Sequence, residues 1–192
     1  MDKVNGKDVS LPDINAQIGE FEVSEGMFSA GKVDKGSSLL SEYFDHRISG
    51  RVADLGAGWG YLSYKLAGAD SRATSIDLFE ADYASLQAAK RNLASCGSDR
   101  RIGFHWIDVT TEFPRKPYDW VVMNPPFHDG RAANPDLGKR FIEVAASTLI
   151  PGGRLLMVAN DNLPYEKTLE KAFKRHQALC VRNGFKVIEA LR

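Results

Sequence analysis

One short segment of the sequence carries residues that could hold a planar amine, Asn124-Pro125-Pro126-Phe127. An exocyclic or amide nitrogen is a poor nucleophile because its lone pair is delocalised. A site that accepts hydrogen bonds from both N–H groups favours pyramidalisation and directs the lone pair toward an electrophile. Asn124 Oδ1 can supply one acceptor, and the Pro125 carbonyl can supply the other on a stiff Pro-Pro backbone. Phe127 can stack on the planar substrate. We therefore predict that Asn124, Pro125, Pro126 and Phe127 are catalytic and that alignment, without a metal, drives the reaction.

A glycine-rich loop could bind the second reactant. The loop reads Asp54-Leu55-Gly56-Ala57-Gly58-Trp59-Gly60 and lies between a predicted strand and a predicted helix. Glycines at the end of such a strand let the backbone approach a ligand without Cβ clashes. The loop is one residue shorter than the GxGxxG pattern of dinucleotide-binding proteins. A plain tight turn is the alternative reading.

Two acidic residues follow the glycine-rich loop at the predicted ends of the next two strands. Asp77 could accept hydrogen bonds from both hydroxyls of a ribose, and Asp108 could accept one from an adenine amino group. Taken singly, each is more often a helix cap or a solvated acid. Together with the loop they match the needs of S-adenosylmethionine (AdoMet), which has a ribose, an adenine and a methionine portion but no phosphate. The predicted cofactor-binding residues are Asp54, Gly56, Ala57, Gly58, Gly60, Asp77, Leu78, Asp108, Val109 and Asn124.

The elements that must position these residues alternate regularly after Gly50. Hydrophobic periodicity predicts strands over 51–55, 73–77, 102–107, 118–123 and 154–159, and helices over 37–47, 59–67, 80–95, 135–150 and 164–175. Two last strands, 178–182 and 185–191, are separated by Asn183-Gly184, which is the strongest short hairpin signal. This order predicts an α/β protein with the Rossmann-like sheet of class I methyltransferases. We expect seven strands, an antiparallel hairpin formed by the last two, and helices on both faces.

The predicted domain organisation is simple. Residues 1–36 read as a loop-rich N-terminal arm with one short strand near 19–23, and residues 37–192 as one AdoMet-dependent methyltransferase domain. The chain has 192 residues, 25 Lys+Arg, 25 Asp+Glu and 43% hydrophobic residues. This composition excludes a disordered tail protein, a collagen and a disulfide-rich miniprotein.

The location of the protein follows from what the sequence lacks. We find no secretory signal and no apolar run near the ~18 residues that a membrane span needs. Cys96 and Cys180 are isolated from each other and from other metal-ligating residues. We therefore expect a cytoplasmic protein with reduced thiols, no metal site and no membrane contact.

With these residues in hand, the chain resembles the ribosomal RNA small-subunit methyltransferase C family, which methylates N2 of a guanine in 16S rRNA. The similarity covers about residues 24–192. It is carried by segments spread along the chain, namely Gly26-Met27-Phe28-Ser29, Asp34-Lys35-Gly36-Ser37, the glycine-rich loop, Asn124-Pro125-Pro126-Phe127-His128-Asp129-Gly130, Val158-Ala159-Asn160, Leu163-Pro164-Tyr165 and Gly184-Phe185-Lys186-Val187.

The resemblance implies AdoMet as the cofactor and ribosomal RNA or the small ribosomal subunit as the partner. It implies that Gly56, Gly58, Asp77 and Asp108 contact the cofactor, and that the segment containing Gly36 lies near it. Typical members also carry a further N-terminal domain, which this chain would lack. We therefore expect either a single-domain relative or a chain trimmed from a longer protein that has the N-terminal domain.

The charge distribution bears on an RNA substrate. The formal net charge is zero, whereas a protein that binds phosphates usually has a basic excess. Residues 1–46 carry 4 basic and 9 acidic side chains, but residues 131–192 carry 11 basic and 6 acidic ones. We hypothesise a local RNA-facing patch that draws on Arg131, Lys139, Arg140, Lys167, Lys171, Lys174 and Arg175.

Two other functions stay open at this point. The four residues Asn124-Pro125-Pro126-Phe127, which we call the amine motif, also suit adenine N6 or a protein glutamine amide. A non-catalytic AdoMet-binding module that docks RNA is less favoured, because both the glycine-rich loop and the amine motif are intact. A nicotinamide oxidoreductase is disfavoured by the short glycine loop and by the terminal hairpin.

Overall fold

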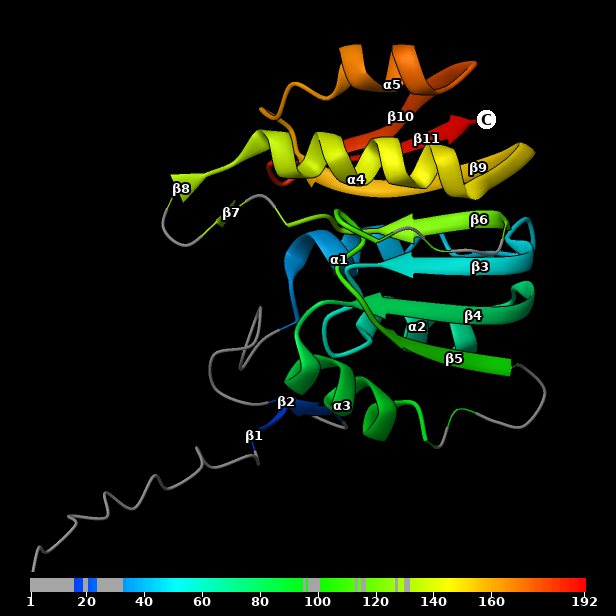
Figure 1. Cartoon of the computed structure of the whole chain (residues 1–192), viewed down its shortest axis with the longest axis vertical. Coiled ribbons are helices and arrows are strands. Elements are labelled where there is room, and N and C mark those ends of the chain that lie inside the picture. The colour runs from blue at the N-terminus through cyan, green and yellow to red at the C-terminus, as the bar shows by residue number, and fades with distance from the viewer. Residues whose placement is uncertain are drawn as a thin grey trace, which may run out of the picture.

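A seven-stranded sheet forms the centre of the structure (Figure 1), which is a computed structural model. The structure describes residues 16–18, 21–23, 33–94, 96, 101–112, 114, 117–126, 128–129 and 132–192. The strand order is β10-β11-β9-β6-β3-β4-β5. The strands are β3 (Ser49–Leu55), β4 (Arg72–Glu80), β5 (Arg101–Trp106), β6 (Tyr118–Met123), β9 (Leu149–Asn160), β10 (Arg175–Arg182) and β11 (Phe185–Leu191). The predicted class I methyltransferase sheet of seven strands is confirmed.

The terminal hairpin forms where the sequence predicts it. Asn183 and Gly184 have φ angles of 55° and 79°, so both adopt the left-handed conformation that a two-residue type I′ turn requires. Strand β11 pairs antiparallel with β10 and with β9, while β9, β6, β3, β4 and β5 pair in parallel. Thus only β11 runs against the other strands of this sheet.

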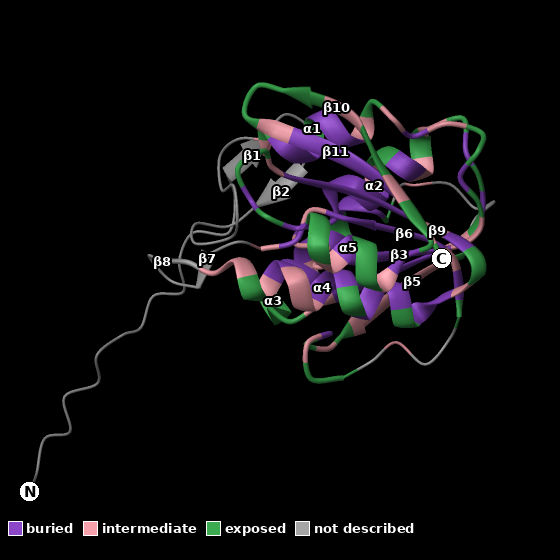
Figure 2. Ribbon diagram, turned by 90° about the horizontal axis from the view of Figure 1, so that it is seen from above, coloured by how far each residue is buried: buried purple, intermediate pink, exposed green. Residues whose placement is uncertain are grey.

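Helices cover both faces of the sheet. Residues alternate along each strand, so Val52 faces one core and its neighbour Ala53 the other. The first core contains residues of α1, α2 and α3, and the second contains residues of α4 and α5. Figure 2 shows the buried sides of the helices turned toward the buried strands. The helices are α1 (Lys35–Ser41), α2 (Tyr61–Gly68), α3 (Tyr83–Asn92), α4 (Pro135–Thr148) and α5 (Glu166–Ala172).

Four of the five helices begin two or three residues from the predicted start, and side-chain capping explains the starts of α1 and α3. Helix α1 begins at Lys35 because the side chain of Asp34 accepts a hydrogen bond from the backbone N–H of Ser37. In the same way, Asp82 caps α3 by accepting from the N–H of Ser85. Strand β4 therefore continues to Glu80, three residues past its predicted end.

Short strand pairs lie outside the main sheet. Strands β1 (Ala16–Ile18) and β2 (Phe21–Val23) form an antiparallel pair in the N-terminal arm, where one strand was predicted. Strands β7 (His128–Asp129) and β8 (Ala132–Ala133) form another pair after β6. No helix in the described part of the chain is long and apolar enough to cross a membrane.

Candidate active site

The glycine-rich loop is tied to the neighbouring strand by backbone hydrogen bonds. The N–H groups of Gly56 and Ala57 both donate to the carbonyl of Phe79, with N···O distances of 2.9 and 3.1 Å. Gly56 has a φ of 70°, and a Cβ there would lie 3.1 Å from the ring of Phe141 on α4. Gly60 has a φ of 87°, and its Cβ would crowd Leu93 after α3. Glycine at these two positions therefore lets the loop lie close to both helix layers.

A cavity of about 390 Å³ opens beside this loop, at the carboxyl ends of the parallel strands. It is lined by residues at or just after the ends of β3, β4, β5 and β6, together with residues of α3 and α4. The lining residues are Gly56, Gly58, Phe79, Glu80, Ala81, Asp82, Ser85, Ile107, Asp108, Val109, Thr110, Asn124, Pro126, Leu137 and Phe141. Open α/β sheets bind their ligands at this edge, so the cavity is the candidate cofactor site.

Glu80 is the acidic residue at the end of β4 that lines this cavity. Its Oε2 accepts from the N–H of Gly58 at 2.7 Å, and its Oε1 accepts from the N–H of Asp82 at 2.8 Å. Each carboxylate oxygen keeps a further lone pair for another donor. Glu80 is not among the residues predicted from the sequence. The Asp82-Tyr83-Ala84-Ser85 capping pattern, which fixes the start of α3 and hence the end of β4, could have revealed it.

Asp77 does not lie where the sequence analysis placed it. It is inside β4, is only 7% exposed, and does not line the cavity. One oxygen lies 3.0 Å from Nε2 of His105, and the other accepts from the hydroxyl of Tyr118 at 3.0 Å. A Cβ at Gly103 would lie 2.0 Å from Oδ1 of Asp77, so the carboxylate packs against the neighbouring strand. The prediction that Asp77 ends its strand is wrong, because burial of Leu78 and Phe79 extends β4.

Asp54 lies beneath the loop and is fully buried. Its Oδ2 accepts from the hydroxyl of Ser63 at 2.7 Å, whereas Oδ1 is buried without a hydrogen-bond partner. Burial raises the pKa of Asp54 to about 7, and the charge of Glu80 adds to this rise, while the hydrogen bonds from Ser63 oppose it. Asp54 thus supports the loop from below, and its ionisation is sensitive to pH near neutrality.

Asn124 follows β6 and lies at the meeting point of two cavities. It lines the cavity already described and a smaller one on the side of α1 and α2. Its Nδ2 donates to Oδ2 of Asp34 at 2.7 Å and to Oγ of Ser37 at 2.8 Å. The residues of the smaller cavity are Asp34, Ser37, Gly56, Ala57, Gly58, Trp59, Tyr61, Leu62 and Asn124. The two cavities thus share Asn124 and two glycines of the loop.

The other predicted site residues fall into three groups. Asp108, Val109 and Pro126 line the larger cavity, and Ala57 lines the smaller one. The buried or packing residues are Gly36, Gly60, Leu78 and Pro125. Phe127 lies outside the described residues.

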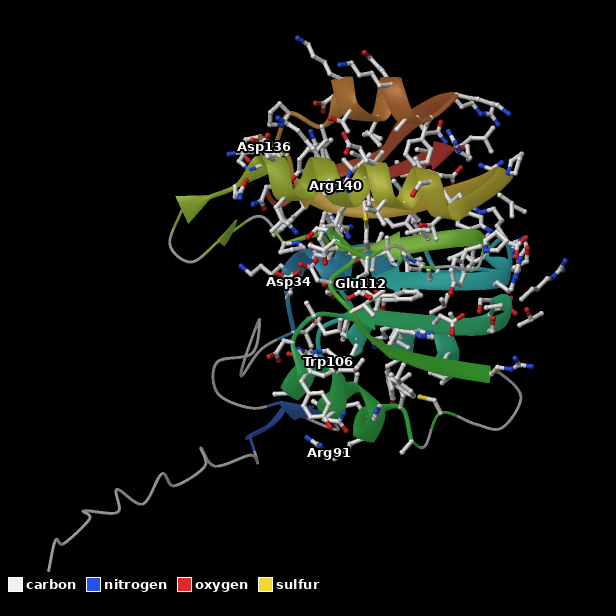
Figure 3. All side chains as sticks on the ribbon, viewed as in Figure 1. Asp34, Arg91, Trp106, Glu112, Asp136 and Arg140 are labelled. Atoms are coloured by element: carbon white, nitrogen blue, oxygen red, sulfur yellow. The ribbon has the colours of Figure 1, made fainter. Side chains whose placement is uncertain are left out.

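Asp108 is one of the residues that the structure brings to the cavity. It lies two residues beyond β5, where its Oδ1 accepts from the N–H and the hydroxyl of Thr110 at 2.8 and 2.7 Å. This local turn fixes the carboxylate at the rim of the cavity. Glu80, the last residue of β4, and Asp108, two residues after β5, therefore line the same cavity from neighbouring strands. Figure 3 shows Asp34, Trp106 and Asp136 at this end of the sheet, each from a different element.

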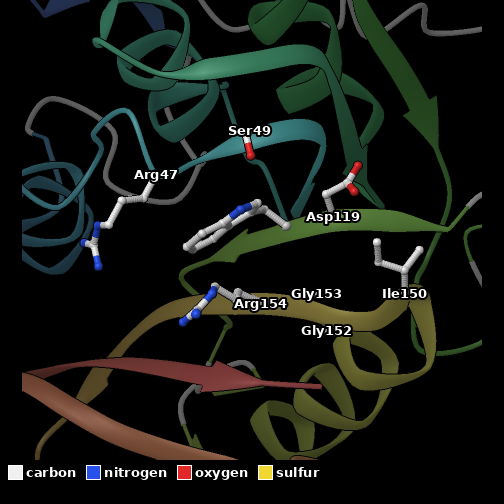
Figure 4. Close-up of a pocket in the computed structure, with 8 residues that line it drawn as sticks. Arg47, Ser49, Asp119, Ile150, Gly152, Gly153 and Arg154 are labelled. Atoms are coloured by element: carbon white, nitrogen blue, oxygen red, sulfur yellow. The ribbon is translucent and has the colours of Figure 1, made fainter.

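A second cavity of similar size lies at the opposite edge, where the parallel strands begin (Figure 4). Arg47 and Arg154 both pair with the buried carboxylate of Glu189, and the guanidinium of Arg154 lies 5.9 Å from the ring centre of Trp120. None of the predicted site residues lines this cavity. The ion pairs of Glu189 with Arg47 and Arg154 join the sheet to the segment after α1, so these charged residues have a structural role.

We looked for clusters of metal-ligating side chains among the described residues. No group of three or more His, Cys, Asp or Glu side chains there is arranged to hold a metal ion. The candidate site instead consists of carboxylates, one amide, backbone N–H groups and apolar side chains.

Known proteins are similar to this chain over most of its length. The chain is 36% identical over 168 residues to a ribosomal RNA small subunit methyltransferase C of Sodalis glossinidius, covering 86% of this chain and 46% of that protein. The corresponding protein of Erwinia tasmaniensis is 33% identical over 179 residues, with 91% and 51% coverage. The chain therefore spans about half the length of these curated relatives.

Solved structures give the same result. A T. thermophilus 16S rRNA N2 methyltransferase in complex with AdoMet and guanosine has a TM-score of 0.76 and 34% identity, covering 90% of this chain and 47% of the other. An O-methyltransferase of Thermotoga maritima, at 20% identity and a TM-score of 0.62, supports the fold alone. The model of the methyltransferase small domain matches residues 19–189. The chain belongs to the methyltransferase small domain family.

Proposed function

We propose that this chain is the catalytic part of an AdoMet-dependent methyltransferase that modifies the exocyclic N2 amine of a guanine in 16S rRNA. The observation that carries the proposal is the position of Asn124, the amide of the amine motif, at the junction of the two cavities. Proteins that are about one third identical to this chain over most of its length are named for this RNA activity.

The residues of the two cavities fit AdoMet. Glu80, rather than Asp77, lines the larger cavity, and its carboxylate, which can accept further hydrogen bonds, suits the two hydroxyls of a ribose. Ile107 and Val109 supply apolar contacts for an adenine, and Asp108 supplies an acceptor for its amino group. The smaller cavity joins the larger at the glycine-rich loop and leaves room for a methionine portion.

The chemistry divides between cofactor and protein. When bound, AdoMet supplies an electrophilic methyl group on a sulfonium sulfur. Asn124 Oδ1 accepts one N–H of the guanine amine, and the Pro125 carbonyl accepts the other, which directs the nitrogen lone pair away from the ring. Phe127 stacks on the base. Holding the two reactants in line can lower the barrier by about 7–11 kcal/mol, and this alignment needs no metal ion.

A surface of α4 and α5 suits the phosphates of the RNA. A groove between these helices is lined by Lys139, Lys167, Lys171 and Arg192 together with two glutamates, Glu143 and Glu166. Both glutamates already pair with basic residues, Arg140 and Lys186. Lys139 pairs with Asp136 at 2.8 Å, but no ion pair joins Lys167 or Lys171 to a described acidic residue. Two exposed lysines one helical turn apart therefore remain for polyanion contacts.

Transfer of a radiolabelled methyl group tests the proposal. The acceptors are free 16S rRNA, assembled small ribosomal subunits from cells that lack the modification, and bulk cytoplasmic protein, each followed by nucleoside or amino-acid analysis. We expect label in N2-methylguanosine from one of the two RNA acceptors. Label in N6-methyladenosine or in methylated glutamine instead would assign the same chemistry to a different amine and overturn the RNA guanine proposal.

A further inference from the structure

We propose that Asp34 is a positioning residue that fixes the rotation of the Asn124 amide, so that Oδ1 rather than Nδ2 faces the amine. The inference deepens the proposed function, because it concerns the same amide. It does not depend on which molecule carries the amine.

The contacts of Asn124 define the rotation. Nδ2 carries two hydrogens, and it lies 2.7 Å from Oδ2 of Asp34 and 2.8 Å from Oγ of Ser37. An ionised carboxylate can only accept hydrogen bonds, so it cannot bind the oxygen of an amide. Turning the amide by half a turn would place two acceptors, Oδ1 and the carboxylate, against each other. No described donor contacts Oδ1, which leaves it for a ligand in the adjoining cavities.

Asp34 is itself held in place. Its Oδ2 also accepts from the N–H of Ser37 at 2.7 Å, and this bond caps α1. Helix α1 is anchored by Leu39 and Leu40, which are buried in the first core. Gly36 leaves space for the carboxylate, because a Cβ there would lie 3.1 Å from Asp34 Oδ2 and 3.0 Å from the ring of Phe185. The cap of α1 and the orientation of Asn124 therefore depend on the same oxygen atom.

The orientation has a consequence for substrate choice. With Oδ1 presented, the site matches a nitrogen that carries hydrogens, such as an exocyclic amine, and opposes a carbonyl oxygen. With Nδ2 presented, two donors would face each other and the amine would lose its acceptor. Asp34 thus helps to select a hydrogen-bond donor as the methyl acceptor, although it does not contact the reacting atoms.

Three substitutions separate this role from the cap. Asp34→Ser keeps a good N-cap residue, but its hydroxyl is too short to reach Asn124. Asp34→Asn keeps both the cap and an oxygen acceptor of the original length. Asp45→Ser is the matched control, because Asp45 also accepts from a backbone N–H, that of Arg47, but does not touch Asn124.

The first readout is the kcat and the KM for AdoMet in steady-state methyl transfer. The acceptor is the molecule that the wild-type chain methylates. We expect Asp34→Ser to lower kcat about 10- to 100-fold, the usual effect of losing a hydrogen bond to a charged group, with KM for AdoMet changed less than about threefold. Asp45→Ser should stay within about threefold of the wild type, whereas Asp34→Asn, which keeps an oxygen acceptor but loses the charge, should restore part of the activity that Asp34→Ser loses. In an Asn124→Ala background, Asp34→Ser should cause no further loss. A higher KM for AdoMet with unchanged kcat would instead make Asp34 a cofactor ligand and overturn the inference.

The second readout needs no activity. In ¹H–¹⁵N spectra the side-chain NH₂ pair of Asn124, identified by its loss in Asn124→Ala, should exchange slowly with solvent in the wild type and in Asp34→Asn. It should exchange at least about tenfold faster in Asp34→Ser, because one of its two acceptors is gone. Equal exchange in all three proteins would overturn the inference even if methyl transfer to RNA is observed. Slow exchange that depends on Asp34 would support it even if the acceptor is not RNA.

Discussion

The carboxylate of Glu80 accepts a hydrogen bond from the backbone N–H of Gly58 at 2.7 Å, and this contact joins the end of β4 to the glycine-rich loop after β3. The two residues come from neighbouring strands and both line the larger cavity. A ligand that enters the loop therefore meets the carboxylate of Glu80. The carboxylate of Asp77 is turned instead toward His105 and Tyr118.

This difference predicts that substitution of Glu80 affects AdoMet binding, whereas substitution of Asp77 affects the stability of the fold. Glu80→Ala should weaken AdoMet binding about 10- to 100-fold, since it removes a charged acceptor from the cavity. Asp77→Asn should change the affinity less than about threefold but lower the free energy of unfolding by about 1–3 kcal/mol, because a buried acceptor of two hydrogen bonds is altered. Calorimetric titration with AdoMet and chemical denaturation measure the two effects. A large loss of affinity in Asp77→Asn, with Glu80→Ala unchanged, would restore the sequence-based assignment.

The fold was predictable because its sequence signals are local. Part of the site could not be predicted, since it depends on the residue at which each strand ends and on contacts between distant residues. Apolar periodicity and the Asn183-Gly184 turn are properties of short segments, and the structure confirms the sheet that they predict. Asp77 and Glu80 are three residues apart on β4. An error of three residues in the predicted end of this strand therefore selects the buried Asp77 in place of Glu80, which lines the cavity. The contact of Asp34 with Asn124 spans 90 residues, and no local pattern predicts such a pair.

Asn124→Ala should separate cofactor binding from methyl transfer. We expect AdoMet affinity to stay within about threefold of the wild type and transfer to fall about 100- to 1,000-fold, the effect of removing one hydrogen-bonding group that stabilises a transition state. Single-turnover transfer and calorimetry measure the two quantities. Asn162→Ala, an exposed asparagine after β9, serves as the control. Turnover like that of the wild type in Asn124→Ala would exclude the acceptor role of this amide.

Asp54 should make the stability of the fold fall as pH rises toward neutrality. Its pKa is raised to about 7 by burial, whereas in the unfolded chain it is about 3.9. Between these values the folded protein keeps a proton that the unfolded chain has released. Asp54 therefore contributes most below about pH 4, loses up to about 1.4 kcal/mol per pH unit above it, and levels off above about pH 7.

Chemical denaturation of the wild type and of Asp54→Asn at pH 5, 6, 7 and 8 measures this contribution. Asparagine does not titrate, so the difference in the free energy of unfolding between the two proteins should shift in favour of Asp54→Asn as pH rises. Other titrating groups are common to both proteins and cancel in the difference. A difference that stays constant from pH 5 to pH 8 would show that Asp54 is ionised throughout.

Charge reversal on α5 should weaken RNA binding mainly through its electrostatic part. Lys167 and Lys171 are exposed and lie along the groove between α4 and α5. In Lys167→Glu/Lys171→Glu the affinity for 16S rRNA at low salt should fall at least about tenfold, and the slope of log K against log[salt] should become shallower by about 1 to 2. The double variant Arg72→Glu/Arg101→Glu changes the net charge equally, but at the edge of the sheet where the parallel strands begin. Equal losses in both double variants would mean that RNA responds only to net charge. A selective loss in the α5 variant, with AdoMet affinity unchanged, would identify this helix as a phosphate contact.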